Sequence, residues 1–239
     1  MAPLIALLAA WILPAQGGER ILSVGSFSML PPGTRTPPGW EMLTFKKVKR
    51  HTRYLLTNDG GTTVIEAFSR NAAAGLIRRL TIDPRRYPII HWRWKIARMI
   101  PGSDLHRRQG DDYPVRLYIT FAYDPEHMSW GQRLRYRAAR LLYGDIPAAA
   151  INYIWARQVA PGTIVDNAYT DFTKMIVVES GPTLVDQWVT EKRDIDQDFR
   201  RAFGYPPPRI TGVAIMTDTD DTGAEALSYY GDITFHQRP

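Results

Sequence analysis

The stretch "IIHWRWKIA" at residues 89–97 decides the fold class, because its side chains alternate between apolar and polar from Ile90 to Ile96. The apolar side chains share one face of an extended chain, namely Ile90, Trp92, Trp94 and Ile96. The opposite face is basic and holds His91, Arg93 and Lys95. Successive side chains of a β-strand point to opposite faces, so the stretch predicts a strand with one buried and one polar face. Trp92 and Trp94 are therefore expected in the core rather than on a carbohydrate-binding surface.

A second stretch, "VRLYITFA" at 115–122, alternates in the same way and presents Arg116, Tyr118 and Thr120 on its polar face. If the two strands are neighbours, their polar faces form one basic, partly aromatic surface. Arginine pairs with carboxylates through two parallel hydrogen bonds, and aromatic rings pack on sugar rings. The candidate residues for binding a glycan or a related anionic polymer are therefore His91, Arg93, Lys95, Arg116 and Tyr118. The alternative is a solvated outer surface, or a face covered by a helix.

The rest of the chain reads mainly as short strands separated by turns. Further strands are expected at 43–49, 53–57, 62–68, 76–82, 174–179, 210–217 and 229–235, with a hairpin at Asn58-Asp59-Gly60-Gly61. Helices are expected at 129–144 and 194–204, each ending at a glycine. This pattern predicts an all-β fold, an antiparallel, jelly-roll-like β-sandwich with one or two short helical insertions. With no internal repeat or low-complexity linker, residues 19–239 are expected to form a single domain.

The composition is that of a folded globular protein, with 44% hydrophobic and 23% charged residues among 239. The absence of cysteine excludes disulfides, thiol nucleophiles and cysteine-ligated zinc. The net charge is +6, and residues 46–140 hold 20 Lys and Arg against 8 Asp and Glu. This imbalance indicates either a surface of mixed charge or a basic face for an anionic polymer or membrane. No run of like charges is long enough to predict nucleic-acid binding.

The first 18 residues, "MAPLIALLAAWILPAQGG", carry no charge, and the apolar part from Leu4 to Leu13 is too short to span a bilayer. Its length suits the core of a signal peptide, and small residues follow it, although no positive charge precedes it. We therefore expect residues 1–18 to be a signal peptide and the protein to be exported, to the periplasm or beyond the cell. The alternatives are a misassigned start codon or a short N-terminal anchor.

Near the C-terminus, "MTDTDDTGAEALSYYGDITF" at 216–235 resembles a calcium-binding loop. Its residues match positions 1, 3, 5 and 6 of an EF-hand, but Tyr229 stands at position 12, where that loop needs a bidentate Glu. The EF-hand is excluded, and another Ca²⁺ site at Asp218, Asp220 and Asp221 stays open. The alternatives are a turn in which the aspartates bond the backbone, or a catalytic role.

Paired aspartates also precede the second clear strand, in "RQGDDYPVRLY" at 108–118. If that strand extends back far enough, alternation places Asp112 on the face of Arg116 and Tyr118. The candidate catalytic carboxylates are Asp112, Asp218 and Asp232. An alternative function is thus a hydrolase or lyase acting on a polysaccharide, which uses Asp112 or the cluster of Asp218, Asp220 and Asp232. The alternative for Asp112 is a salt bridge at the start of the strand.

Other catalytic patterns are absent: GxSxG, HExxH, a phosphate-binding glycine loop and a dinucleotide fingerprint. The basic helix at 129–144 could rest on anionic lipid, or it could be an ordinary amphipathic helix packed on the sandwich. Tryptophans in less regular contexts are better candidates for exposed stacking than those of 89–97; these are Trp40, Trp130, Trp155 and Trp188.

Several motifs, taken in order, resemble a bacterial family of exported proteins catalogued as domain of unknown function 3047. They are "PPGW", "YPIIHWRWKI", "GDDYPVRLYITF", "INYIWA" and "FGYPPPRITGVAIMTDTDDTGAEALSYYGDITF", and they span nearly the whole chain after residue 18. The resemblance implies no activity for any residue. A looser, fold-level similarity links the final "YYGDITF" to jelly-roll carbohydrate-binding modules, which often end with an aromatic residue, an Asp and an apolar strand. A fold of that kind hosts many functions.

Overall fold

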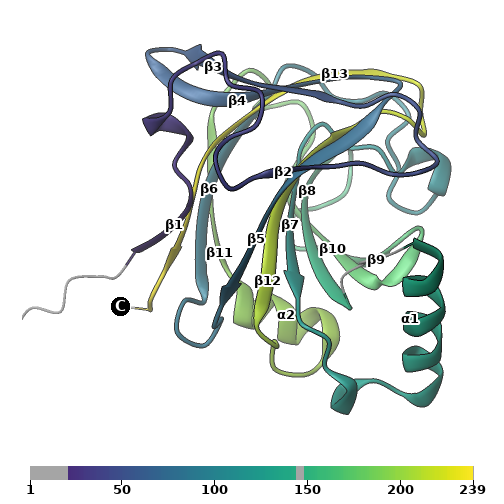
Figure 1. The fold of residues 1–239 in the computed structure, drawn as a ribbon. Helices are drawn as coiled ribbons and strands as arrows, with labels where there is room; N and C mark the ends of the chain where they lie inside the picture. The colour runs from purple at the N-terminus through teal and green to yellow at the C-terminus, as the bar shows by residue number, and fades with distance from the viewer. Residues whose placement is uncertain (1–20, 144–147, 239) are drawn as a thin grey trace, which may run out of the picture.

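The computed structural model describes residues 21–143 and 148–238, and these form two β-sheets packed face to face (Figure 1). We call them sheet A and sheet B. The signal peptide expected at 1–18 lies outside the described residues. The β-sandwich predicted from the sequence is confirmed.

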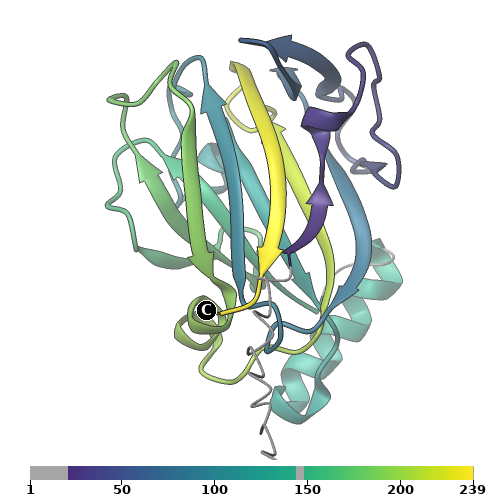
Figure 2. The same cartoon turned by 90° about the vertical axis from the view of Figure 1, so that its left-hand side faces the viewer.

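Sheet A has the order β11-β6-β13-β4-β3, and β1 pairs with the second half of β13. All of its pairs are antiparallel. Figure 2 looks onto this sheet, with β11, β6, β13 and β1 side by side in front. Its strands are β1 (Ile21–Gly25), β3 (Arg53–Asp59), β4 (Thr62–Arg70), β6 (Ile89–Ile96), β11 (Val189–Asp194) and β13 (Glu225–His236).

Sheet B has the order β2-β5-β12-β7-β8-β10-β9, and its β8–β10 pair is parallel, whereas the others are antiparallel. Its strands are β2 (Glu41–Leu43), β5 (Ala73–Ile82), β7 (Arg116–Phe121), β8 (Ala149–Ala156), β9 (Ile164–Asn167), β10 (Thr170–Ser180) and β12 (Ile210–Asp218).

From β4 to β7 the chain alternates between the sheets, since β4 and β6 belong to sheet A whereas β5 and β7 belong to sheet B. The two clearest strands of the sequence, β6 and β7, therefore lie in different sheets, on opposite sides of the core, instead of pairing. Their polar faces lie on opposite outer surfaces. The single basic surface expected from both strands does not form.

The core fills the space between the sheets with the alternating apolar side chains. Trp92 and Trp94 of β6 are 2% and 0% exposed, which confirms their expected core role. Trp92 stacks on Tyr153 of β8 with ring centroids 5.1 Å apart, so the two sheets interlock through aromatic rings. Two of the tryptophans proposed for exposed stacking, Trp40 and Trp155, are also buried, so that prediction is wrong for them.

Both helices lie at the lower end of the molecule in Figure 1, and each has a local sequence reason to begin where it does. In α1 (Trp130–Tyr143), Ser129 Oγ accepts from the Gln132 amide while Gln132 Oε1 accepts from the Ser129 amide, which is a capping box. In α2 (Ile195–Phe203), Asp194 caps the start and left-handed Gly204 ends the helix. The remaining helical segments are 3₁₀ turns, η1 (Phe27–Met29), η2 (Arg108–Gly110) and η3 (Pro125–His127).

The hairpin predicted at 58–61 joins β3 to β4, and Gly60 and Gly61 take the positive φ values that its two-residue turn requires. The strand expected at 43–49 is wrong, because β2 ends at Leu43 and a turn follows, with the Val48 amide bonded to the Phe45 carbonyl. The strands β1, β8, β9 and β11 were not predicted. Among the described residues, no helix has the length and apolar character needed to cross a membrane.

Candidate functional site

The outer face of sheet A carries the polar side chains of β6, and Arg93 is at its centre. The Arg93 guanidinium lies over the ring of Trp188 at 4.5 Å from the centroid. Trp188 precedes β11 and reaches the same face, because Val189 pairs with Trp94 and Trp188 therefore falls beside Lys95. Within the described part of the chain, the Arg93 guanidinium forms no ion pair and no hydrogen bond, and its charge acts on Asp59 only as a minor cause of the lowered pKa of that carboxylate. Its N–H donors are available to a ligand.

Gly231 of β13 explains why Arg93 lies flat. A Cβ atom at position 231 would stand 2.5 Å from both Cγ and Nε of Arg93, so only glycine leaves room for the arginine stem across this strand. The register of β13 against β6 shifts between Tyr230 and Ile233, so the glycine sits in an irregular part of the pair. The glycine of "YYGDITF" thus positions a cation on the outer face.

Lys95 extends the same face but is neutralised. Its ammonium pairs with Asp59 at 2.7 Å, and Asp59 also accepts from Trp188 Nε1 at 2.7 Å. The ammonium lies 4.5 Å from the ring centroid of Tyr229. The hydrogen bond from Lys95, and to a smaller extent the one from Trp188, lower the pKa of Asp59 below its usual value, so this carboxylate stays ionised. The result is a fixed cluster of cations and aromatic rings.

At the other end of β6, His91 stacks on His236 with ring centroids 4.1 Å apart. We define the cation–aromatic face as His91, Arg93, Lys95, Trp188 and Tyr229. Three of the five predicted ligand-binding residues belong to it. The sequence marks Trp188 only as a candidate for exposed stacking, and it marks Tyr229 only as the residue that excludes an EF-hand.

The other two predicted ligand-binding residues, Arg116 and Tyr118, lie on the outer side of sheet B, and Arg116 is only 1% exposed. Its Nε and one terminal nitrogen donate to the two carboxylate oxygens of Asp218, at 2.9 and 2.5 Å. The other terminal nitrogen donates to Asp111 and to the Tyr118 hydroxyl, both at 3.3 Å. With a further bond to the Asp111 carbonyl, every guanidinium N–H is used within the protein. Arg116 holds the 108–113 segment to the end of β12 and offers no donor to a surface ligand.

The prediction that Asp112 shares the face of Arg116 is wrong. Asp111, not Asp112, meets Arg116, because β7 begins only at Arg116 and the aspartates lie outside the strand, where its alternation does not hold. Asp112 instead accepts from the backbone and hydroxyl of Thr222, each at 2.6 Å, and from the Asp221 amide. It therefore ties the 108–113 segment to the loop between β12 and β13, whereas the salt bridge at the start of the strand, the alternative for Asp112, is made by Asp111.

Three carboxylates converge beside this ion pair: one oxygen each of Asp112, Asp218 and Asp220 lie within 4.8 Å of one another. Burial, together with Asp112 and Asp221, raises the pKa of Asp220 to about 6. Burial also raises the pKa of Asp218, although Arg116 opposes that shift. The three residues could hold a divalent cation, since hard cations prefer carboxylate oxygens. The set differs from the predicted one, because Asp221 turns away to accept from the Tyr169 hydroxyl at 2.6 Å.

Asp232 lies apart from these carboxylates. It belongs to β13 in sheet A and accepts from the backbone amide and hydroxyl of Ser28, at 2.9 and 2.5 Å. Those bonds fix the 3₁₀ turn η1 against β13. The structure therefore does not bring Asp232 together with Asp112 and Asp218 as one catalytic set.

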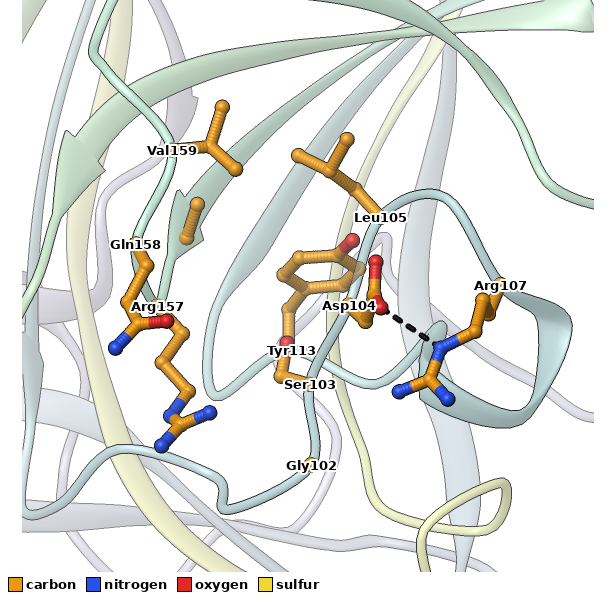
Figure 3. Close-up of a pocket in the computed structure, with 10 residues that line it drawn as sticks. Gly102, Ser103, Asp104, Leu105, Arg107, Tyr113, Arg157, Gln158 and Val159 are labelled. Atoms are coloured by element: carbon orange, nitrogen blue, oxygen red, sulfur yellow. Dashed lines mark hydrogen bonds and ion pairs between the residues drawn. The ribbon is translucent and has the colours of Figure 1, made fainter.

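A pocket of about 240 Å³ opens where β8 ends, and the Tyr113 ring lies in the middle of its lining (Figure 3). Asp104 and Arg107, which pair at 2.7 Å, lie on one side of that ring, and Arg157 and Gln158 lie on the other. The Arg116 guanidinium also lies over this ring, at 4.4 Å from the centroid. The Tyr113 hydroxyl is buried and has no partner among the described residues. Neither Asp112 nor Asp218 lines this pocket.

Sequence reasoning also missed two buried polar groups. Asn152 of β8 is 0% exposed, and neither its amide nitrogen nor its oxygen has a partner in the described structure. Glu191 of β11 is 9% exposed, and burial and the nearby Glu179 carboxylate raise its pKa to about 7. A polar residue inside the apolar run "AAINYIWA" is a signal that could have drawn attention to Asn152. No comparable signal marks Glu191, since "VTEKRD" reads as a polar segment.

These features define a two-sheet β-sandwich with a cation–aromatic outer face and a buried cluster of one arginine and several carboxylates. The chain belongs to the family described as protein of unknown function (DUF3047), whose model matches residues 38–234. The family resemblance drawn from the sequence motifs is thereby confirmed. The match includes every residue of the cation–aromatic face and of the carboxylate cluster. Among curated proteins, none matches the chain.

Proposed function

We propose that the protein is exported and binds an acidic glycan, or a related anionic polymer of the cell envelope, on the outer face of sheet A. The observation that carries this proposal is the Arg93 guanidinium, which is stacked on Trp188 and forms no ion pair with a carboxylate of the described residues. A guanidinium can bind a carboxylate through two parallel hydrogen bonds, and the adjacent indole offers an apolar surface to a sugar ring. A uronic acid unit has both features.

The shape of the cation–aromatic face suits an extended ligand. A strand rises about 3.3 Å per residue, so His91 and Lys95 lie roughly 13 Å apart along β6. That length exceeds one sugar ring, and the row consists of half-buried side chains on the outer side of the sheet. A polymer can therefore make several weak contacts in sequence, with Arg93 as the charged contact at the centre.

The alternative function, a hydrolase or lyase, has less support. Asp112 and Asp218 are 0% and 3% exposed, and their oxygens are occupied by the 221–222 loop and by Arg116. Asp232 lies in the other sheet. A general acid or base must come within hydrogen-bond reach of a substrate, and Asp112 and Asp218 are enclosed by the protein.

The experiment compares polygalacturonate with the same polymer after reduction of its carboxyl groups, using affinity electrophoresis and calorimetry on the full chain. We expect binding to the acidic form alone. Arg93→Gln should weaken it about ten-fold or more, the usual size of a lost charge-assisted hydrogen bond, and Trp188→Ala should weaken it as well. The matched control is Arg157→Gln, which removes an exposed arginine beside the pocket at the end of β8. Equal binding by wild type and Arg93→Gln, or no binding to polygalacturonate and alginate, would refute the proposal.

A further inference from the structure

Helix α1 presents large apolar side chains to solvent on its outer side. Trp130 is 78% exposed and Leu134 is 52% exposed. The two are four residues apart, so they lie next to each other on one face of the helix. Arg137, seven positions after Trp130, is exposed on that same face. Large apolar groups exposed together usually mark a contact surface.

The other side of α1 is fixed to the protein. Tyr136 is 6% exposed and packs with Met128, Ala148 and Phe172. Its ring also stacks on Tyr123 with centroids 5.0 Å apart. The inner side of the helix is therefore packed against the protein. In Figure 2, α1 lies behind sheet A, so its outer face is separate from the cation–aromatic face.

The charge of α1 has one sign. Its sequence holds four arginines, Arg133, Arg135, Arg137 and Arg140, and no acidic residue. Arg135 is paired with Asp171 at 3.0 Å and Arg133 donates to the Met128 carbonyl, whereas Arg137 has no partner among the described residues. A surface that is both apolar and basic complements a partner that is both apolar and acidic. A membrane with anionic headgroups is such a partner, and tryptophan and arginine are typical of helices that lie in its interface.

We infer that α1 docks the protein on an anionic lipid surface, with Trp130 and Leu134 inserted at the level of the headgroups and Arg137 on the lipid phosphates. This inference does not rest on the proposed glycan binding, because it uses a different face. The insertion of the helix is shallow, because a 14-residue helix that is packed against the protein along one side can only lie in the membrane plane.

The test is co-sedimentation of the full chain with vesicles of phosphatidylcholine alone and with vesicles that contain phosphatidylglycerol. We expect stronger binding to the anionic vesicles and a decrease with salt. The double variant Trp130→Ser, Leu134→Ser should lower the partition coefficient about ten-fold or more. Arg137→Gln should lower it about five-fold, the value for one arginine near an anionic surface. The N-terminal segment is the same in all proteins compared, so it cannot cause the differences.

Met29→Ser is the matched control, because Met29 is 81% exposed and belongs to η1, which is fixed to β13 of sheet A. It should bind vesicles like wild type, as should Arg93→Gln. Circular dichroism and melting temperatures near the wild-type values establish that the double variant is folded. Equal partition of the double variant and wild type overturns the inference. So does equal binding to both vesicle types, or a protein partner that needs Trp130 and Leu134 while vesicles do not bind.

Discussion

Arg116 and Asp218 form a two-bond ion pair in which both side chains are almost completely buried, at 2% and 5% exposure. This pair joins the 108–113 segment to the end of β12 and brings Asp111, Tyr118 and the Tyr113 ring around the guanidinium. Breaking a buried pair leaves an uncompensated charge in a medium that cannot solvate it. The pair is therefore a position at which single substitutions should have large effects.

We predict that Arg116→Met lowers the free energy of unfolding by about 3–5 kcal/mol. Denaturant unfolding measures this, with Arg85→Gln as control, since Arg85 is 76% exposed in its pair with Asp83 and should contribute less than about 1 kcal/mol. If both variants lose the same small amount, the buried cluster does not hold the segment in place.

Asn152 offers a gain of stability. Leucine has nearly the shape of asparagine and needs no hydrogen bonds, so Asn152→Leu should raise the unfolding free energy by about 1–2 kcal/mol. Asn167→Leu is the matched control with the opposite expectation, because Asn167 donates to Asp111 at 2.8 Å and its loss leaves that carboxylate short of a partner. A destabilised Asn152→Leu would mean that the amide has a partner, such as a buried water, that the protein structure alone does not contain.

A pH effect follows from Glu191. Its pKa is raised to about 7 by burial and by Glu179, so its contribution to stability is fully present below pH of about 4.5 and is lost as the pH rises through 7. Glu191→Gln should therefore gain about 2–3 kcal/mol relative to wild type between pH 5 and pH 8. Unfolding curves across that range measure the difference. Glu41→Gln, on the exposed strand β2, should run parallel to wild type.

The three carboxylates of Asp112, Asp218 and Asp220 predict a second change of stability with pH. Burial, and then repulsion from Asp112 and Asp221, raise the pKa of Asp220 to about 6, so the cost of the charged form appears as the pH rises through that value. With a chelator present, Asp220→Asn should be about 1–2 kcal/mol more stable than wild type at pH 8, and the difference should vanish near pH 4. Added Ca²⁺ tests the calcium prediction: an ion held by the trio would raise the melting temperature of wild type and leave Asp220→Asn unchanged.

The local part of the fold could be predicted from the sequence, because alternation in β6 and β7 and the Gly60-Gly61 turn are decided by neighbouring residues. The strand β8 could not, since both of its faces are buried and its run is continuously apolar, which removes the alternation. The pairing of strands was beyond the sequence as well. An alternating pattern says which side of a strand is buried, but not whether the next strand lies beside it or across the core.

The unknown strand pairing also explains why the residues of the candidate site could be predicted only in part. Arg93 and Arg116 carry the same local signal, a basic residue on the polar side of a strand. Their environments differ because distant segments surround them: Asp111 and Asp218 enclose Arg116, whereas the Arg93 guanidinium lies over the ring of Trp188. Burial by remote parts of the chain, not residue type, separates a structural arginine from one that is free to bind.

Gly231 provides the sharpest test of the cation–aromatic face, because it controls Arg93 without touching a ligand. A methyl group at 231 would stand 2.5 Å from the Arg93 stem, which is a flexible side chain and can move aside. Gly231→Ala should therefore displace the guanidinium from Trp188 and weaken polygalacturonate binding nearly as much as Arg93→Gln, while the unfolding free energy changes by less than about 1.5 kcal/mol.

Gly61→Ala is the control, since Gly61 has a positive φ and no atom within 4 Å of the added carbon, so it should cost stability without affecting binding. In the double variant with Arg93→Gln, the alanine should cause no further loss of affinity, because both changes act through one side chain. Additive losses in that double variant would show that Gly231 acts on binding by a route other than Arg93.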